Sequence, residues 1–432
     1  MLLKAKKILS TDLVKVSFLN GVAQVIRMLT GLISVKVVAP IIGPVGVALM
    51  GQLNNFSQIV LSISNGGINA GITKYVSEYS DSEEDYTFYI GTGFWITLFL
   101  SVITSLVLII GAGYFAEDIL HDVKYKSVFY VFGFTIILYA LNALLTSVIN
   151  GFKEYRKYVI ANMVGSIVGL LFSVVLAFQY KIYGALIALV TYQSIVFFLT
   201  LWIVRKSYWF KWKVFISRFT KSTSLKLGHY SMMALVSAIT VPAGQIIVRN
   251  FIIKDQSLFD AGLWEGVNRI SNMYLGVITT SLSVYFLPRL SEIKVVKELR
   301  TEIFSVYKLI IPFLIITTLI IFLFRVLIIH ILFTREFMGM QDLFGYQLIG
   351  DIFKIIGWVL GYLLLAKAMT KTYIVMEMVS FVVLIIVSYF LVKQYGPVGA
   401  TLAFAIVYLV YLLVLCGVFR RLLFTKDEIL KL

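Results

Sequence analysis

Apolar residues occur along this chain in long runs rather than in alternation, and a short polar or charged segment bounds each run. A helix needs about 20 apolar residues to cross about 30 Å of hydrocarbon. The pattern predicts twelve such helices, near residues 14–38, 45–72, 88–113, 128–150, 158–179, 182–204, 229–253, 262–288, 304–324, 343–366, 372–392 and 397–419. The predicted fold class is therefore an all-α integral membrane protein.

The composition supports the same class and excludes several others. Hydrophobic residues make up 60% of the chain and charged residues 14%, whereas a soluble domain has about 45–50% and about 25%. The single cysteine, Cys416, excludes a disulfide framework and a cysteine-based zinc site. The sequence has no phosphate-binding loop of the G-x-x-x-x-G-K-[ST] type and no long polar stretch. We therefore predict a protein that is not an enzyme, has no cofactor and uses no ATP.

The basic residues are distributed unequally between the predicted loops. Loops with excess Lys and Arg mark the cytoplasmic side of a membrane. Most of them lie in the N-terminal segment and in the alternate loops that are on the same side of the membrane. They are Lys4, Lys6, Lys7, Lys153, Arg156, Lys157, Arg205 to Lys226, Arg289, Lys294, Lys297, Arg300, Lys371, Arg420 and Arg421. This asymmetry predicts that both termini are cytoplasmic.

Residues recur in the two halves of the chain at a nearly constant offset. Asn54 and Asn268 are 214 positions apart, and Gly184 and Gly399 are 215 apart. The offset predicts a tandem repeat, with an N-terminal six-helix lobe at 1–206 and a C-terminal six-helix lobe at 228–432. An even number of helices makes the repeats parallel, and such transporters bind substrate between the two bundles and rock one against the other.

The segment 207–227 between the lobes is rich in aromatic and basic residues. At helical spacing, Trp209, Trp212, Ile216 and Phe219 fall on one face, which predicts an amphipathic helix in the cytoplasmic interface. Two interpretations stay open: the segment only fixes the topology, or it also contacts anionic lipid headgroups.

Ionisable residues inside predicted membrane helices are functional candidates, because burying them in lipid is costly. The cationic candidates for substrate binding are Arg27, Lys36, Arg249, Arg269 and Lys354, and the acidic candidates for ion coupling are Asp351 and Glu377. Asp351 and Lys354 are three residues apart, so an ion pair within one helix is an alternative for them. Cations outnumber acids in this set, which favours an anionic phosphate or pyrophosphate as the ligand.

Several stretches resemble a known family. They are Gly43-Pro-Val-Gly46, Gly67-Ile-Asn-Ala-Gly-Ile-Thr-Lys-Tyr-Val-Ser-Glu-Tyr79, Leu263-Trp-Glu-Gly-Val267, Tyr285-Phe-Leu-Pro-Arg-Leu-Ser291, Gly350-Asp-Ile-Phe-Lys354 and Gly361-Tyr-Leu-Leu-Leu-Ala-Lys367. Together they resemble the Wzx-type flippases of bacterial surface polysaccharide synthesis, namely O-antigen translocases and the lipid III flippases of enterobacterial common antigen. The resemblance covers essentially the whole chain.

This resemblance implies a fold similar to the multidrug and toxin extruders (MATE) of the MOP superfamily, located in the bacterial inner membrane. It implies a flippase that moves undecaprenyl-pyrophosphate-linked oligosaccharide units from the cytoplasmic to the periplasmic leaflet by alternating access. The implied partners are this lipid-linked oligosaccharide, membrane lipids and the polysaccharide polymerase machinery, with no nucleic acid. Coupling to H⁺, to Na⁺ or to the membrane potential stays open. A drug or cation antiporter, a lipid II-type flippase and a capsular repeat-unit exporter are the alternatives.

Overall fold

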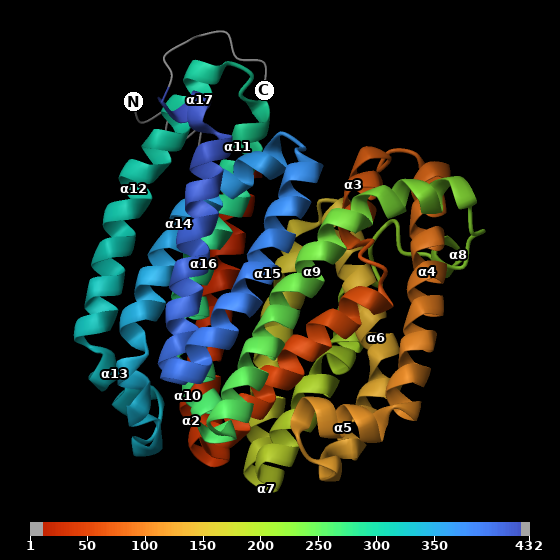
Figure 1. The fold of residues 1–432 in the computed structure, drawn as a ribbon. Helices are drawn as coiled ribbons and strands as arrows, with labels where there is room; N and C mark the ends of the chain where they lie inside the picture. Colours follow the sequence, from red (N-terminus) through yellow and green to blue (C-terminus); the bar gives the residue numbers. More distant parts are fainter. Residues whose placement is uncertain (1–11, 425–432) are drawn as a thin grey trace. The chain divides into compact units, whose positions relative to one another are not determined.

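The computed structural model describes residues 12–424, with side chains for all of these except 12–20, 229, 230, 232, 233, 284 and 424. The described chain is helical and contains no strand (Figure 1). The N-terminal half has α2 (Asp12–Ser64), α3 (Asn69–Glu78), α4 (Glu83–Ile110), α5 (Ala112–Leu120), the short 3₁₀ turn η1 (Val123–Tyr125), α6 (Lys126–Gly151), α7 (Tyr155–Val204), α8 (Trp212–Phe215) and α9 (Lys221–Asp255).

The C-terminal half contains the second series of helices. They are α10 (Leu258–Ser281), the π-helical turn η2 (Leu282–Phe286), α11 (Leu287–Glu292), α12 (Val296–Leu323), α13 (Arg325–Leu332), the 3₁₀ segment η3 (Arg335–Asp342), α14 (Phe344–Ala366), α15 (Thr370–Tyr395), α16 (Pro397–Val418) and α17 (Arg420–Phe424). The all-α fold class predicted from the sequence is confirmed over the described residues.

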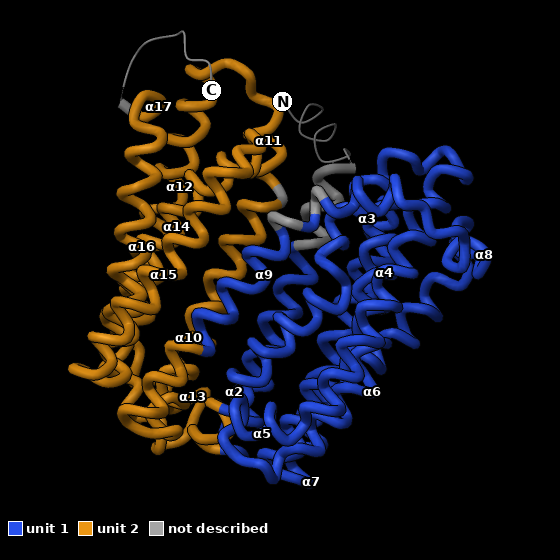
Figure 2. Tube along the Cα trace, turned by 45° about the vertical axis from the view of Figure 1, so that its right-hand side comes forward, with its two compact units in different colours: residues 1–42, 49–246 blue, residues 43–48, 247–432 orange. Residues whose placement is uncertain are grey.

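The chain forms two compact units, which Figure 2 colours separately. Unit 1 contains residues 1–42 and 49–246, and unit 2 contains residues 43–48 and 247–432. In unit 1, α6 packs against α3, α4, α5 and α7; in unit 2, α14 packs against α10, α12, α15 and α16. These units are defined by contacts, whereas the lobes at 1–206 and 228–432 are defined by the repeat, so the lobe boundaries stay a prediction.

The backbone recurs at the same 215-residue offset as the sequence. The turn after α6 has Lys153 at a φ of 57°, and the turn after α14 has Ala368 at a φ of 52°. In the first turn the amide of Glu154 donates to the carbonyl of Ile149, and in the second the amide of Met369 donates to the carbonyl of Leu364. The two turns therefore have the same backbone conformation and the same hydrogen bond.

A second recurrence divides α7. The helix is interrupted at Lys181, with φ 51° and ψ −130°, and Gly396 separates α15 from α16 with φ 58° and ψ −139°. Three residues later, a Cβ on Gly184 or Gly399 would lie 1.9 Å or 2.0 Å from a carbonyl oxygen of the preceding helix. Only glycine fits such an approach, so the two halves of α7 correspond to α15 and α16.

Nine of the described helical segments are long and apolar enough to cross a membrane. They include α2, with 53 residues and a non-helical Gly43, and α7, with 50 residues. The helix α10, which carries Glu265 and Arg269, is not among the nine. The protein is therefore a multi-pass membrane protein. The basic residues Lys4, Lys6 and Lys7, used above for the orientation, lie outside the described residues.

The segment between the predicted lobes differs from the expected amphipathic helix. Over the aromatic residues of this segment the helix is α8, which is four residues long, and the long helix α9 begins only at Lys221. Trp209 is fully buried and stacks on Phe152 with ring centroids 5.0 Å apart, whereas Trp212, Ile216 and Phe219 are more than half exposed. The prediction of one shared helical face is therefore wrong. Burying the large Trp209 ring against the ring of Phe152 stabilises the protein more than placing it on an exposed face with Trp212, Ile216 and Phe219 would.

Candidate functional site

A polar hollow of about 360 Å³ lies within unit 1, among α2, α6 and α7. Arg27 of α2 is an exposed side chain and the one charged residue among those that line it. Its polar lining also includes amide and hydroxyl side chains, those of Asn142, Thr146, Asn162, Ser166, Tyr192, Gln193 and Thr200. Arg27 thus gives the described lining of the hollow one positive charge and no negative one, which suits an anion.

Two glycines of α7 determine how closely its two halves approach at this hollow. A Cβ on Gly165 would lie 3.3 Å from Val196, and a Cβ on Gly169 would lie 2.9 Å from the ring of Tyr192. Small residues spaced four apart allow such close helix packing in membranes. The Gly165-x-x-x-Gly169 pattern thereby positions Tyr192 at the hollow.

A second hollow in unit 1 is apolar, in contrast to the hollow beside Arg27. A larger hollow of about 720 Å³ in the same unit is lined mainly by apolar side chains, including Trp95, Phe99 and Leu235. Polar groups inside membrane-spanning helices are costly unless they have partners. The amides and hydroxyls gathered beside Arg27 make this hollow the candidate binding site of unit 1.

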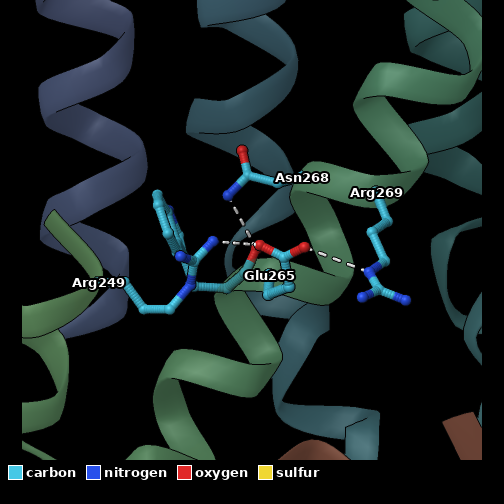
Figure 3. Close-up of polar contacts among 5 residues, drawn as sticks. Arg249, Glu265, Asn268 and Arg269 are labelled. Carbon is cyan, nitrogen blue, oxygen red and sulfur yellow. Dashed lines mark hydrogen bonds and ion pairs between the residues drawn. The ribbon is translucent and has the colours of Figure 1, made fainter. Parts of the chain in front are cut away.

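In unit 2, two of the predicted cations share one carboxylate (Figure 3). Arg249 Nη2 lies 2.5 Å from Glu265 Oε2, and Arg269 Nε lies 3.2 Å from Glu265 Oε1. The guanidinium of Arg249 also lies over the ring of Trp264, 5.3 Å from its centroid. Arg249 is fully buried. Glu265 thus cancels one of the two charges, and this cluster carries a net charge of about +1 rather than +2.

Asp351 of α14 is fully buried in unit 2 and is held by neutral donors. Its Oδ2 accepts hydrogen bonds from the hydroxyl of Ser271 and, at 2.6 Å, from that of Tyr274. Its Oδ1 accepts a third bond from Gln347 Nε2 at 3.3 Å. Three donors from two helices give this buried acid a fixed geometry.

Lys354 does not form the ion pair with Asp351 that their spacing allows. Its ammonium nitrogen lies 4.9 Å from the ring centroid of Trp358, 5.6 Å from that of Phe404 and 5.4 Å from that of Tyr408. Aromatic faces attract a cation at these distances. The alternative of a direct ion pair within one helix is therefore wrong, because Asp351 is held by Ser271, Tyr274 and Gln347, and Lys354 lies among aromatic rings of α14 and α16.

Of the two other predicted residues, Lys36 lies apart from these clusters and Glu377 lies near the aromatic residues around Lys354. Lys36 is exposed and does not line the hollow with Arg27, because nine residues at 100° each place the two side chains on opposite sides of α2. Glu377 of α15 is partly buried, within electrostatic range of Tyr408 and Tyr411. The structure thus brings Lys354 and Glu377 to the same aromatic group.

Sequence reasoning did not select several residues of these sites. Glu265 lies four residues before Arg269, and this spacing predicts a contact between them on a helix. The sequence could therefore have indicated Glu265. Phe404 and Tyr408 have the same spacing on α16. The partnership of Ser271 and Tyr274 with Asp351 joins α10 to α14, and no local pattern reveals it.

Comparisons with known proteins agree with this description. The "Lipid III flippase" of Escherichia coli (strain K12) is 28% identical over 417 residues, which cover 94% of this chain and 98% of that protein, and the same figures hold for the one of Shigella flexneri.

Two solved structures show the same fold. One is described as "Lipid II flippase MurJ, inward closed conformation", with a TM-score of 0.76 and 17% identity over 93% of this chain and 87% of that one. The other is an inward-facing multidrug resistance MATE family transporter of the MOP superfamily, with a TM-score of 0.74 and 14% identity over 94% of this chain and 96% of that one. Residues 13–294 match the family described as "Polysaccharide biosynthesis protein", and the chain belongs to that family.

Proposed function

We propose that this protein is a flippase that moves polyprenyl-diphosphate-linked oligosaccharides, of the O-antigen or lipid III type, from the cytoplasmic to the periplasmic leaflet of the bacterial inner membrane. The observation that carries the proposal is the polar hollow of unit 1, in which Arg27 is the one charged residue of the described lining. Membership of the polysaccharide biosynthesis family and two relatives named lipid III flippases support the substrate class. The delivered oligosaccharide is the proposed substrate of a polysaccharide polymerase.

The charge of the hollow favours a diphosphate over an organic cation. The planar guanidinium of Arg27 can form two parallel hydrogen bonds to phosphate oxygens, and such charge-assisted bonds are strong. A drug-cation site needs an acid, and none of the described side chains that line this hollow is acidic. The likeness to MATE structures at 14% identity concerns the fold. The cation antiporter is therefore the weaker candidate.

We also propose twelve membrane crossings with both termini in the cytoplasm. At 1.5 Å per residue, the 53 residues of α2 and the 50 of α7 are each more than twice as long as the hydrocarbon core is thick. Each is therefore proposed to cross twice, with Gly43 and Lys181 at the turns, and α10 supplies the twelfth crossing. Reporter fusions at 43, 181 and the C-terminus would test this: an active periplasmic reporter at the C-terminus would contradict it.

We propose that transport uses a driving force other than ATP, because the sequence has no phosphate-binding loop of the G-x-x-x-x-G-K-[ST] type. Export of a headgroup with two negative charges is favoured by about 2.3 kcal/mol per charge for each 100 mV of membrane potential. MATE structures exist in inward-facing and outward-facing conformations, which is consistent with alternating access. We propose that Asp351 binds the coupling H⁺ or Na⁺ during the return step, because its three fixed donors form a preorganised acidic site.

The coupling proposal predicts the behaviour of Asp351→Asn. This change keeps the side-chain volume but removes the titratable group, so transport should lose its response to an imposed H⁺ or Na⁺ gradient and fall about tenfold in rate under that gradient. Asp342→Asn, at an exposed acid of η3, is the matched control and should keep the response. The measurement is the translocation rate in vesicles with and without each gradient. A gradient response that survives in Asp351→Asn but disappears in Glu377→Gln would assign the role to Glu377 instead.

The proposed function itself is tested by removing the protein from its cell. A lipid-linked oligosaccharide should then accumulate in the cytoplasmic leaflet, and the surface polysaccharide made from it should be lost. Mass spectrometry of the lipid extract identifies the sugar unit. Normal surface polysaccharide together with increased sensitivity to cationic drugs would reject the flippase and favour the antiporter.

A further inference from the structure

We propose that the hollow beside Arg27 is a carbohydrate subsite, which binds the sugar joined directly to the diphosphate. This inference rests on the proposed function and makes it more specific: Arg27 contacts the phosphate, and the neutral side chains behind it contact hydroxyl or N-acetyl groups of a pyranose ring. The ligand class is thus a polyprenyl diphosphate that carries a neutral hexose or N-acetylhexosamine.

The first argument is a directed chain of hydrogen bonds across the hollow. Asn142 Nδ2 donates to Gln193 Oε1 at 3.3 Å, and Gln193 Nε2 donates to the hydroxyl oxygen of Tyr192 at 2.8 Å. Since the oxygen of Tyr192 accepts this bond, its own proton is available as a donor. One end of the chain therefore presents an O–H donor to the hollow.

The opposite end of the chain presents an acceptor. Asn142 is only 5% exposed, and its Oδ1 has no hydrogen-bond partner among the described residues. A buried carbonyl oxygen without a partner destabilises the protein, because it has lost its hydrogen bond to water. Such a group needs an explanation, and a ligand donor such as a sugar hydroxyl or an acetamido N–H supplies one.

The remaining lining adds acceptors rather than charges. The hydroxyl of Ser166 donates to the carbonyl of Asn162, and that of Thr146 donates to the carbonyls of Asn142 and Ala143. Their oxygens keep lone pairs for a ligand. A site for phosphate alone would need further cations, whereas sugar hydroxyls both donate and accept. The neutral, mixed lining therefore fits a carbohydrate better than a second anion.

The volume agrees with a small part of the substrate. Small-molecule pockets have volumes of about 300–1,000 Å³, and this hollow measures about 360 Å³. It suits the sugar nearest the diphosphate and not a complete oligosaccharide. A flippase with this subsite would select its substrate by the first sugar and would tolerate variation farther along the chain.

The test compares two defined lipids as probes for the purified protein: a polyprenyl diphosphate, and the same lipid bearing one N-acetylhexosamine. Affinities can be measured by titration with native mass spectrometry. The wild-type protein should bind the sugar-bearing lipid about tenfold more tightly. Tyr192→Phe and Asn142→Leu should each lower this preference about threefold to tenfold, because they weaken the binding of the sugar-bearing lipid more than that of the bare lipid.

Two further variants make the outcome specific. Tyr183→Phe removes a tyrosine hydroxyl of α7 that bonds Ser127 outside the hollow, and it should keep the full preference. Arg27→Gln should lower the affinity for both lipids by the same factor. The subsite would be overturned if the wild-type protein bound the bare lipid tightly and showed no preference for the sugar. It would also be overturned if Tyr192→Phe lost the same factor of affinity for both lipids. Neither result would contradict the proposed flippase function. No binding of either lipid by the wild-type protein would overturn both.

Discussion

Arg27→Ala is expected to reduce transport about a hundredfold or more while the protein still accumulates in the membrane. A hydrogen bond to a charged group contributes about 1.5–3 kcal/mol, and the guanidinium can form two such bonds to a diphosphate. Arg27 is an exposed side chain on a polar hollow, so its removal should change stability by only about 0.5 kcal/mol. The measurement is restoration of surface polysaccharide in a strain that lacks the protein, with the variant quantified in the membrane.

Two further variants separate the charge of Arg27 from its shape and position. Arg27→Lys keeps the charge but loses the planar pair of donors, so it should restore polysaccharide only partly. Lys126→Ala removes one exposed cation of unit 1 that does not line the hollow and should restore it fully. Full activity of Arg27→Ala would remove Arg27 from the substrate site.

Glu265→Ala is expected to have the largest effect on stability, about 3–5 kcal/mol, because it leaves the buried guanidinium of Arg249 without its carboxylate. Arg269 loses the same partner. Since a typical protein is stable by only about 5–15 kcal/mol, most of the variant should fail to accumulate. The thermal unfolding midpoint in detergent and the amount in the membrane both report this effect.

The control for Glu265 is an exposed pair of the same residue types. Glu292 lies 3.7 Å from Arg289, with the two side chains 68% and 46% exposed, and Glu292→Ala should cost less than about 1 kcal/mol. Replacing Arg249 and Glu265 together by methionine removes both charges and should recover much of the stability lost in Glu265→Ala. If Glu265→Ala were as stable as Glu292→Ala, the pair with Arg249 would not be an important contact.

The helices of this fold could be predicted from the sequence because a bilayer demands long apolar segments. The runs predicted at 128–150, 343–366 and 397–419 correspond to α6, α14 and α16. The duplication could be predicted because the positions of closest backbone approach keep their glycines, as Gly184 and Gly399 show. The break in α7 could also be predicted, because Lys181 separates two apolar runs.

The pairing of side chains could not be predicted, since it depends on which helices become neighbours. Periodicity correctly relates Glu265 to Arg269, but it gives no reason for Arg249 to reach the same carboxylate from α9. Asp351 and Lys354 share a helix face, yet Asp351 bonds Tyr274 of α10 and Lys354 lies over Phe404 and Tyr408 of α16. Among the predicted cations, helix geometry alone would have separated Lys36 from Arg27.

The most direct test of the central claim uses the purified protein in sealed vesicles that contain a polyprenyl-diphosphate-linked oligosaccharide. A lectin added outside binds only sugars of the outer leaflet, so its binding over time measures translocation. We expect the wild-type protein to move sugar from the inner to the outer leaflet far faster than protein-free vesicles do, and Arg27→Ala to be close to the protein-free rate. Equal rates with and without the wild-type protein, under an imposed membrane potential and under H⁺ or Na⁺ gradients, would contradict the assignment of this chain as a flippase.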